Sequence, residues 1–140
     1  MPDKADTNST PQPLTLQQAL DLAVEHHTSG DLPRAESIYN QILNAAPNQP
    51  QPLHLLGVIA FQGGDNERAI ELIEKALSIH PDYAEAHSNL GLAIQNLGRV
   101  DDAVVHFRKA LALKPDYAEA HNNLGIPLKE LEQSKEAVAR

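Results

Sequence analysis

The sequence predicts an all-α fold of stacked helical units, and three observations support that prediction. From Leu14 onward, apolar residues recur every three or four positions, which is the period of a helix with one buried face. No segment shows the sustained alternation of polar and apolar residues that is typical of a half-buried strand. The segment from Pro81 to Gly91 recurs from Pro115 to Gly125 with a single change. A fixed period of this length is typical of repeated units that stack on their neighbours.

Helix-breaking residues divide the chain into elements. Residues 1–13 are polar and contain three prolines, so we expect a disordered tail there, followed by one domain over residues 14–140. Within that domain the breakers are Gly30, Pro47, Gly63 with Gly64, Pro81, Gly98 and Pro115. They define helices of roughly 12 to 15 residues joined by short turns. We therefore expect repeats over residues 16–49, 50–83 and 84–117, and a partial repeat over 118–140.

Small residues stand at matching positions of the two helices in the repeats, where they allow a close approach: Ala23, Gly57, Gly91, Gly125, Ala69 and Ala103. Asp82 and Asp116 are placed to cap the first helix of the next repeat. Glu85 and Glu119 stand three residues later and would complete a pattern like a capping box. Each repeat is thus expected to be a pair of closely packed helices.

The partial fourth repeat departs from the others. Pro127 falls inside its first helix and removes a backbone donor there, so we expect a kink or an early stop. Glu132 replaces the turn glycine that the third repeat has at Gly98, so residues 128–140 are expected to form one helix. Three apolar residues then lack their usual cover: Leu124, Leu128 and Leu131. We expect these leucines and Pro127 to mediate a homodimer through residues 117–140, with a frayed monomer as the alternative.

The composition excludes several classes of protein. The 140 residues carry a formal net charge of −8, whereas a nucleic-acid-binding protein needs a basic face. The sequence contains no cysteine, which excludes disulfide scaffolds and thiolate zinc sites. The longest run of apolar and glycine residues, Leu55 to Phe61, is too short to span a bilayer, and the first residues do not resemble a signal peptide. We therefore expect a cytoplasmic protein that has neither nucleic acid nor a membrane as a partner.

The histidines do not predict a metal site or an active site. His87 and His121 are separated by one repeat period, so they are copies of one repeat position with an expected packing or groove role. Asp102 and His106 are one helical turn apart, but two ligands are weak evidence for a metal, and we expect a solvated face. No Gly-rich phosphate loop and no serine flanked like a nucleophile is present in the sequence. We expect no catalysis, no cofactor and no metal.

Several of these positions coincide with the motif of a known family. In the second and third repeats they are Leu56-Gly57, Ala69, Ile73, Ala76-Leu77 and Pro81, then Leu90-Gly91, Ala103, Phe107, Ala110-Leu111 and Pro115. The chain resembles the bacterial type of tetratricopeptide repeat (TPR), a pair of antiparallel helices. The first repeat departs from the motif, because Ala23 replaces the usual glycine. The resemblance implies a right-handed helix-turn-helix solenoid, a TPR superhelix of about 3.5 repeats.

In this family the first helices line a concave groove that binds extended peptides or partner helices. Carried over by position, the groove residues are Gln17, Asp21, Val24, His27, His54, Leu55, Val58, Gln62, Ser88, Asn89, Leu92, Asn96, Asn122, Asn123 and Lys129. Asn89 and Asn123 stand out because an amide has both donors and an acceptor and can hold a peptide backbone. They resemble the asparagine ladder in the repeats of O-linked N-acetylglucosamine (O-GlcNAc) transferases. Recent duplication of a repeat is the alternative explanation for this pair of asparagines.

The resemblance leaves three functions open. The first is a non-catalytic protein–protein interaction scaffold. The second is the N-terminal substrate-recognition segment of a larger enzyme, such as an O-GlcNAc-transferase-like glycosyltransferase, and the third is a self-assembling repeat module. Family members that clamp the carboxylate of a chaperone tail use groove lysines and arginines. Here Leu20 and Asp21 stand where the first repeat would need a cation, which argues against that specificity.

Overall fold

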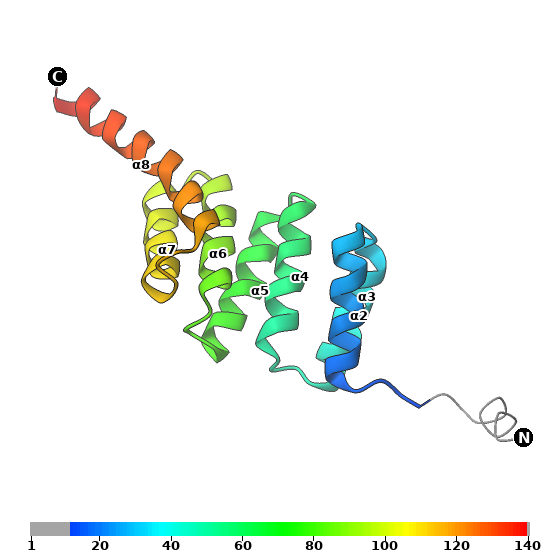
Figure 1. Ribbon diagram of the computed structural model, residues 1–140. Coiled ribbons are helices and arrows are strands. Elements are labelled where there is room, and N and C mark those ends of the chain that lie inside the picture. The colour runs from blue at the N-terminus through cyan, green and yellow to red at the C-terminus, as the bar shows by residue number, and fades with distance from the viewer. Residues whose placement is uncertain (1–11, 140) are drawn as a thin grey trace, which may run out of the picture.

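The computed structural model describes residues 12–139, which form seven α-helices and no strand (Figure 1). The helices are α2 (Leu16–Ser29), α3 (Leu32–Ala45), α4 (Pro50–Gln62), α5 (Asn66–Ile79), α6 (Ala84–Asn96), α7 (Val100–Leu113) and α8 (Ala118–Ala139). The all-α prediction is therefore confirmed. Most of the tail predicted over residues 1–13 lies outside the described residues, and positions 12 and 13 are exposed without regular structure.

Six of the helices form three pairs: α2 with α3, α4 with α5, and α6 with α7. The turn within each pair contains one glycine with a positive φ: Gly30 (91°), Gly64 (86°) and Gly98 (84°). A side chain is strained in this left-handed conformation, so glycine is favoured there. Because these glycines are spaced by one repeat period, the same sharp turn recurs in every pair.

The pairs stack in chain order, so that helices far apart in the sequence lie side by side (Figure 1). The second helix of each pair packs against the first helix of the next pair. First helices also meet directly, since α4 contacts α6 and α6 contacts α8. This arrangement is a helix-turn-helix solenoid, in which each unit is stabilised by its neighbours.

Glycine allows the two helices of a pair to approach each other closely. A Cβ atom added to Gly91 would lie 2.6 Å from Cε1 of Phe107, and one added to Gly57 would lie 2.7 Å from Cγ1 of Ile73. Both large side chains are fully buried, so they fill the space that the missing Cβ leaves. The close approach predicted at these two glycines is confirmed. It is wrong for Gly125, where an added Cβ would meet nothing within 4 Å, because no paired second helix follows in α8.

The predicted caps at the starts of the later units are wrong. Tyr83, and not Asp82, occupies the N-cap position of α6, and no side chain caps this helix. In the next unit, α8 begins at Ala118, and the backbone N–H of His121 donates to the carbonyl oxygen of Tyr117 at 3.1 Å, one residue beyond Asp116. Each of these helices therefore starts one residue too late for the preceding aspartate to be its N-cap.

Two histidines hold the turns at these helix starts. The Nε2–H group of His87 donates to the carbonyl oxygen of Pro81 at 2.9 Å, and His121 makes the same bond to Pro115 at 2.8 Å. These bonds join the first turn of a helix to the proline that ends the preceding segment. The repeated histidine is therefore a structural residue of the turn between units.

The last helix, α8, runs without a break from Ala118 to Ala139, and Pro127 lies inside it. The early stop predicted at Pro127 is wrong, whereas the missing turn at Glu132 and the helix that continues beyond residue 128 are confirmed. The side chain of Pro127 is fully buried, and α8 packs against α7 and α6. Burial of this apolar ring offsets part of the cost of the lost backbone hydrogen bond.

The two glycines at matching positions of α6 and α8 provide a paired test of the close approach. We expect Gly91→Ala to lower the free energy of unfolding by about 1–3 kcal/mol, because its Cβ would overlap Phe107. Gly125→Ala is the control, since the added methyl has open space in a helix and is expected to raise stability by up to about 1 kcal/mol. Urea unfolding measures both effects. Equal effects of the two substitutions would contradict the explanation.

Candidate functional site

The inner surface is the side of the solenoid formed by α2, α4, α6 and α8 as far as Lys129, and it contains the predicted groove residues. The exposed ones are Gln17, Asp21, Gln62, Asn96, Asn122 and Lys129. The half-buried ones are Val24, His27, Leu55, Val58, Asn89, Leu92 and Asn123. His54 and Ser88 are buried, with 4% and 1% of their surface exposed. These two residues therefore lie beneath the inner surface and support the residues above them.

Three hydrogen bonds, which we call the cross-unit bonds, link first helices of neighbouring units at one constant separation of 35 residues. They are His27 Nε2 with Gln62 Oε1 (3.0 Å), Asn89 Nδ2 with His54 Nε2 (2.8 Å), and Asn123 Nδ2 with Ser88 Oγ (3.3 Å). The separation is one repeat plus one residue, so these bonds follow from the stacking of the units. Both asparagines predicted to hold a peptide are thus attached to the preceding unit.

The partners of His54 determine which of its ring nitrogens carries the proton. The amide nitrogen of Asn89 can only donate, so Nε2 of His54 accepts from it. In the neutral ring, Nδ1 then carries the proton and donates to the hydroxyl oxygen of Tyr83 at 2.9 Å. Burial lowers the pKa of His54 to about 4, an effect that the nearby Glu85 opposes and His27 reinforces. His54 is therefore neutral at pH 7, with both nitrogens engaged.

His27 links the first two units through hydrogen bonds at both of its ring nitrogens. The side-chain oxygen of Gln62 can only accept, so Nε2–H of His27 donates to it. Nδ1 is then free to accept from the hydroxyl of Tyr39, at 3.2 Å. Tyr39 is fully buried, and burial raises the pKa of its hydroxyl to about 12. This network joins α2, α3 and α4 through side chains alone.

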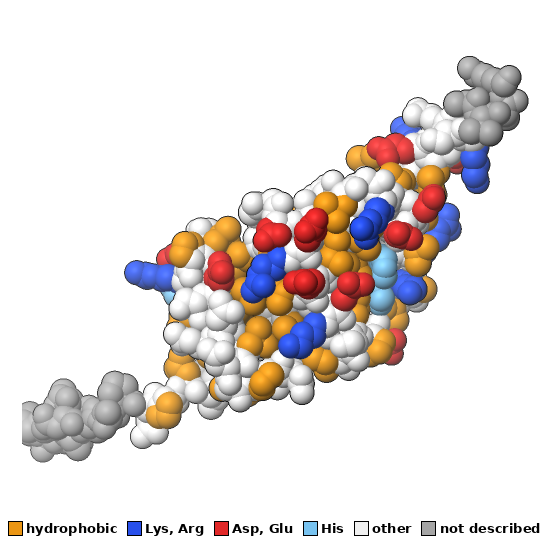
Figure 2. Space-filling model, turned by 180° about the vertical axis from the view of Figure 1, so that it is seen from behind, with side chains coloured by type: hydrophobic (Ala, Val, Ile, Leu, Met, Phe, Trp, Pro, Cys, Tyr) orange, Lys and Arg blue, Asp and Glu red, His pale blue; other side chains and the backbone are white. Residues whose placement is uncertain are grey.

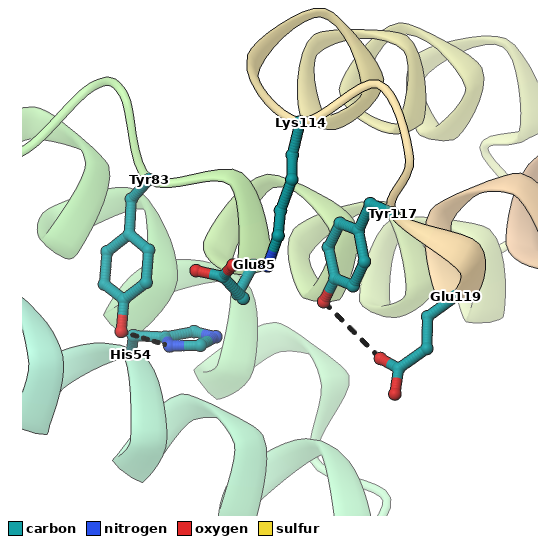
Figure 3. A network of polar contacts seen from close by, with 6 residues as sticks. All are labelled: His54, Tyr83, Glu85, Lys114, Tyr117 and Glu119. Carbon is teal, nitrogen blue, oxygen red and sulfur yellow. Dashed lines mark hydrogen bonds and ion pairs between the residues drawn. The ribbon is translucent and has the colours of Figure 1, made fainter.

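A second polar network lies beside His54 where the turns between units meet α6 and α8 (Figure 3). Nζ of Lys114 pairs with Oε1 of Glu85 at 2.9 Å and lies 4.8 Å from the centre of the Tyr117 ring. The Tyr117 hydroxyl donates to Oε2 of Glu119 at 3.4 Å. Burial raises the pKa of Glu85, but the hydrogen bond and charge of Lys114 lower it by more, so that this pKa lies below its usual range.

Tyr83 and Tyr117 are functional candidates that the sequence reasoning missed. They occupy the same position of successive repeats, and burial raises the pKa of each hydroxyl to about 12. Tyr83 also lines a surface hollow of about 710 Å³ together with His80, Asp82, Glu85 and Lys114. The repeated Pro-Asp-Tyr segment could have identified both tyrosines, since polar aromatic residues at one phase of a repeat are placed on the same side of the array.

The solvated face predicted for Asp102 and His106 is found for Asp102 only. His106 is half-buried because α6 brings His87 against it, with the two Nδ1 atoms 3.3 Å apart. His87 uses its Nε2–H for Pro81, so its Nδ1 accepts the proton that Nδ1 of His106 donates. Burial lowers the pKa of His106 to about 4, and the charges of His87 and Lys109 lower it further. The contact is a structural hydrogen bond that joins α6 to α7.

The residues predicted for self-association are partly covered by the chain itself. Pro127 is fully buried and offers no surface to a second copy. Leu124, Leu128 and Leu131 are half-buried, because α8 packs against α7 and α6. The adjacent Ile126 is instead 62% exposed. The apolar surface that α8 presents to solvent is therefore smaller than the sequence suggested.

Other features of the described residues do not point to a second site. Between residues 12 and 139, no three histidine, aspartate or glutamate side chains come together as metal ligands. Within the same range, no helix combines the length and the apolar character needed to cross a membrane. Figure 2 shows the face opposite to the view of Figure 1, where acidic and basic side chains are interspersed among apolar ones. A surface of mixed charge is typical of a solvated face.

Comparison with known proteins identifies the repeats. A family model of the TPR repeat matches residues 57–98 and 96–131. A solved structure of an O-GlcNAc transferase variant from Thermobaculum terrenum is similar, with a TM-score of 0.79 and 33% sequence identity. The match covers 81% of this chain and 22% of that chain, so the chain spans about a fifth of the transferase structure. No curated protein matches the sequence.

Two further solved structures share the fold. One is the first TPR of Spaghetti (RPAP3) bound to the HSP90 peptide SRMEEVD, with a TM-score of 0.78, 20% identity, and coverage of 84% of this chain and 93% of that chain. The other is the Sgt2 TPR domain from Aspergillus fumigatus, with a TM-score of 0.80, 22% identity, and coverage of 91% and 85%. At these identities the similarity demonstrates the fold alone.

The buried His54 predicts a loss of stability in mild acid. The unfolded chain binds a proton at this residue below a pKa of 6.5, whereas the folded chain does so only near pH 4. Between these values the unfolded state holds more protons, so the free energy of unfolding falls by about 1.4 kcal/mol per pH unit through His54. His106 acts in the same direction. Urea unfolding between pH 7 and about pH 4.5 measures the slope, and His54→Gln is expected to flatten it. An unchanged slope in this variant would contradict the assignment.

Proposed function

The chain belongs to the tetratricopeptide repeat family, and from this premise we propose that it is a non-catalytic scaffold whose inner surface binds an extended segment of a partner protein. The observation that carries this proposal is the matched pair Asn89 and Asn123. They occupy the same position of neighbouring first helices, and each is attached to the preceding unit by one amide N–H. A carboxamide has a second N–H and an oxygen. These groups can hold the backbone of a peptide that runs across α6 and α8.

The spacing of the units supports an extended partner. Neighbouring packed helices lie about 8–10 Å apart, which is close to three residues of extended chain at about 3.4 Å each. Asn89 and Asn123 would then contact peptide residues that are three positions apart. The half-buried Val58 and Leu92 provide apolar contacts for the side chains between them. Backbone contacts of this kind bind many sequences, and the apolar positions add selectivity.

The charge of the inner surface favours a neutral or basic partner. The sequences of α2, α4 and α6 contain no lysine or arginine, whereas Asp21 and Glu85 are acidic, and Lys129 of α8 is the single cation among the predicted groove residues. Lys114, at the end of α7, is already paired with Glu85. Carboxylate recognition relies on charge-assisted hydrogen bonds from lysine or arginine. We therefore propose that this surface does not bind acidic tails such as the one bound in the Spaghetti structure.

A second candidate function rests on the similarity to the Thermobaculum terrenum O-GlcNAc transferase. In this alternative the repeats deliver a protein substrate to a glycosyltransferase domain of the same polypeptide. The same inner surface would bind the substrate, so the residues proposed above keep their roles. The natural coding sequence distinguishes the two candidates, because only the second requires an in-frame glycosyltransferase domain after the codon for Arg140.

Selection from a random peptide library tests the binding mode. A linear peptide of about ten residues is long enough to cross three units. We expect peptides selected on the wild-type protein to bind the double variant Asn89→Ala, Asn123→Ala at least about tenfold more weakly, because each lost hydrogen bond contributes about 1 kcal/mol. Fluorescence anisotropy measures the affinity.

The matched control for this selection replaces two exposed asparagines of a second helix, Asn40 and Asn44 of α3, with alanine. Because these residues lie outside the inner surface, we expect the selected peptides to keep their affinity for the control variant. The proposal fails if the selected peptides bind the Asn89/Asn123 variant as tightly as the wild type.

The peptide SRMEEVD, labelled at its N-terminus, tests whether the inner surface excludes acidic tails. We expect no saturable binding at concentrations that saturate the protein with a library-selected peptide, because no cation of α2, α4 or α6 meets its carboxylates. Tight, salt-sensitive binding of SRMEEVD would show that the carboxylates are recognised in another way.

A further inference from the structure

The cross-unit bond between Asn89 and His54 restricts how Asn89 can face a ligand. Nδ2 of Asn89 lies 2.8 Å from Nε2 of His54, so this end of the amide points into the protein. If the amide flipped so that its oxygen and nitrogen changed places, the oxygen would face the lone pair of Nε2, and the two acceptors would repel each other. The bond therefore selects one of the two orientations of the amide. The oxygen and the second N–H are left on the outward side.

His54 can accommodate a flipped amide only if its tautomer and the role of the Tyr83 hydroxyl change together. It is 4% exposed, its Nδ1–H donates to the Tyr83 hydroxyl at 2.9 Å, and the two rings meet edge to face with centres 4.7 Å apart. A flipped Asn89 would require the proton to move from Nδ1 to Nε2, and the Tyr83 hydroxyl to reverse its role. Because both ring nitrogens have partners, the two changes would have to occur together.

From this geometry we propose that His54 is a positioning residue that fixes the orientation in which Asn89 meets a bound peptide. The inference rests on the proposed peptide binding. In it, the buried His54 of the preceding unit determines which groups of Asn89 face the peptide. His54 does not touch the peptide. It acts by keeping one acceptor and one donor of Asn89 in a fixed order along the inner surface.

The corresponding contact one unit later is looser. Ser88 is 1% exposed and stands where His54 stands in the preceding unit, and its hydroxyl lies 3.3 Å from Nδ2 of Asn123. A hydroxyl can donate or accept by rotating about one bond, so it tolerates either orientation of the Asn123 amide. Asn89 is therefore the fixed contact and Asn123 the adaptable one. We expect Asn89→Ala to weaken binding of the selected peptides more than Asn123→Ala.

Three substitutions of His54 separate its two hydrogen bonds. Glutamine places its amide near the former position of Nε2 and can still accept from Asn89, whereas asparagine reaches only the position of Nδ1 and keeps the contact with Tyr83. Leucine removes both contacts. We expect His54→Gln to retain peptide affinity within about twofold, and His54→Asn and His54→Leu to weaken it about fivefold to tenfold. The probe is the tightest capped peptide from the random library.

NMR of the free protein tests the positioning role without any peptide. In the wild type, the ¹⁵N shifts of His54 are expected to show an unprotonated Nε2 and a protonated Nδ1, and the side-chain amide of Asn89 is expected to exchange slowly with solvent. His54→Gln should preserve the slow exchange of Asn89, and His54→Asn should abolish it while the melting curve remains cooperative.

The outcomes distinguish this inference from the proposed function. A protonated Nε2 in the wild type, or equal peptide affinity of the glutamine and asparagine variants, would overturn the role of His54 even if peptides bind. If the library yields no peptide, peptide binding by the inner surface fails, and the positioning role falls with it even if the NMR shifts are as expected. Support requires both the expected tautomer and the ranking of the variants.

Discussion

Contact between the two helices of a pair is limited by the side chain at one position, and glycine occupies that position in α4 and α6. At Gly57 and Gly91 a Cβ would overlap Ile73 and Phe107, so any larger residue would push the helices apart. The distance within a pair then determines where the next first helix can pack. The cross-unit bonds of Asn89 and Asn123 join first helices whose positions depend on this packing. The geometry of the inner surface therefore depends on two glycines that lie beneath it.

Most of the fold could be predicted from the sequence, because the fixed repeat period and the turn glycines at one phase of it are local features. The starts of α6 and α8 could not. They depend on how the preceding turn packs, and here His87 holds the carbonyl of Pro81, which moves the N-cap from Asp82 to Tyr83. At Pro127 the sequence left a kink and an early stop open, and the early stop was wrong because the buried environment of the proline ring arises from tertiary packing.

In the candidate site, the sequence predicted the residues at the surface but not the buried residues that support them. The phase of Asn89 and Asn123 placed both on the first helices, and the structure confirms that location. Their hydrogen bonds to His54 and Ser88 join residues that are 35 positions apart in the sequence. These bonds form only when two units stack, so the sequence of one unit does not predict them. His54 looked like a contact residue for the same reason. A repeated polar residue on a first helix can lie on the surface or beneath it, and only the packing decides which.

The cross-unit bonds also have a mechanical consequence. A solenoid behaves as a spring whose curvature is the sum of small rotations between units. All three bonds bridge first helices, so they act as short links along one side of the coil. Straightening the coil would stretch these links before it disturbed the outer helices. We therefore expect the links to make the array stiffer against unbending than against tighter coiling.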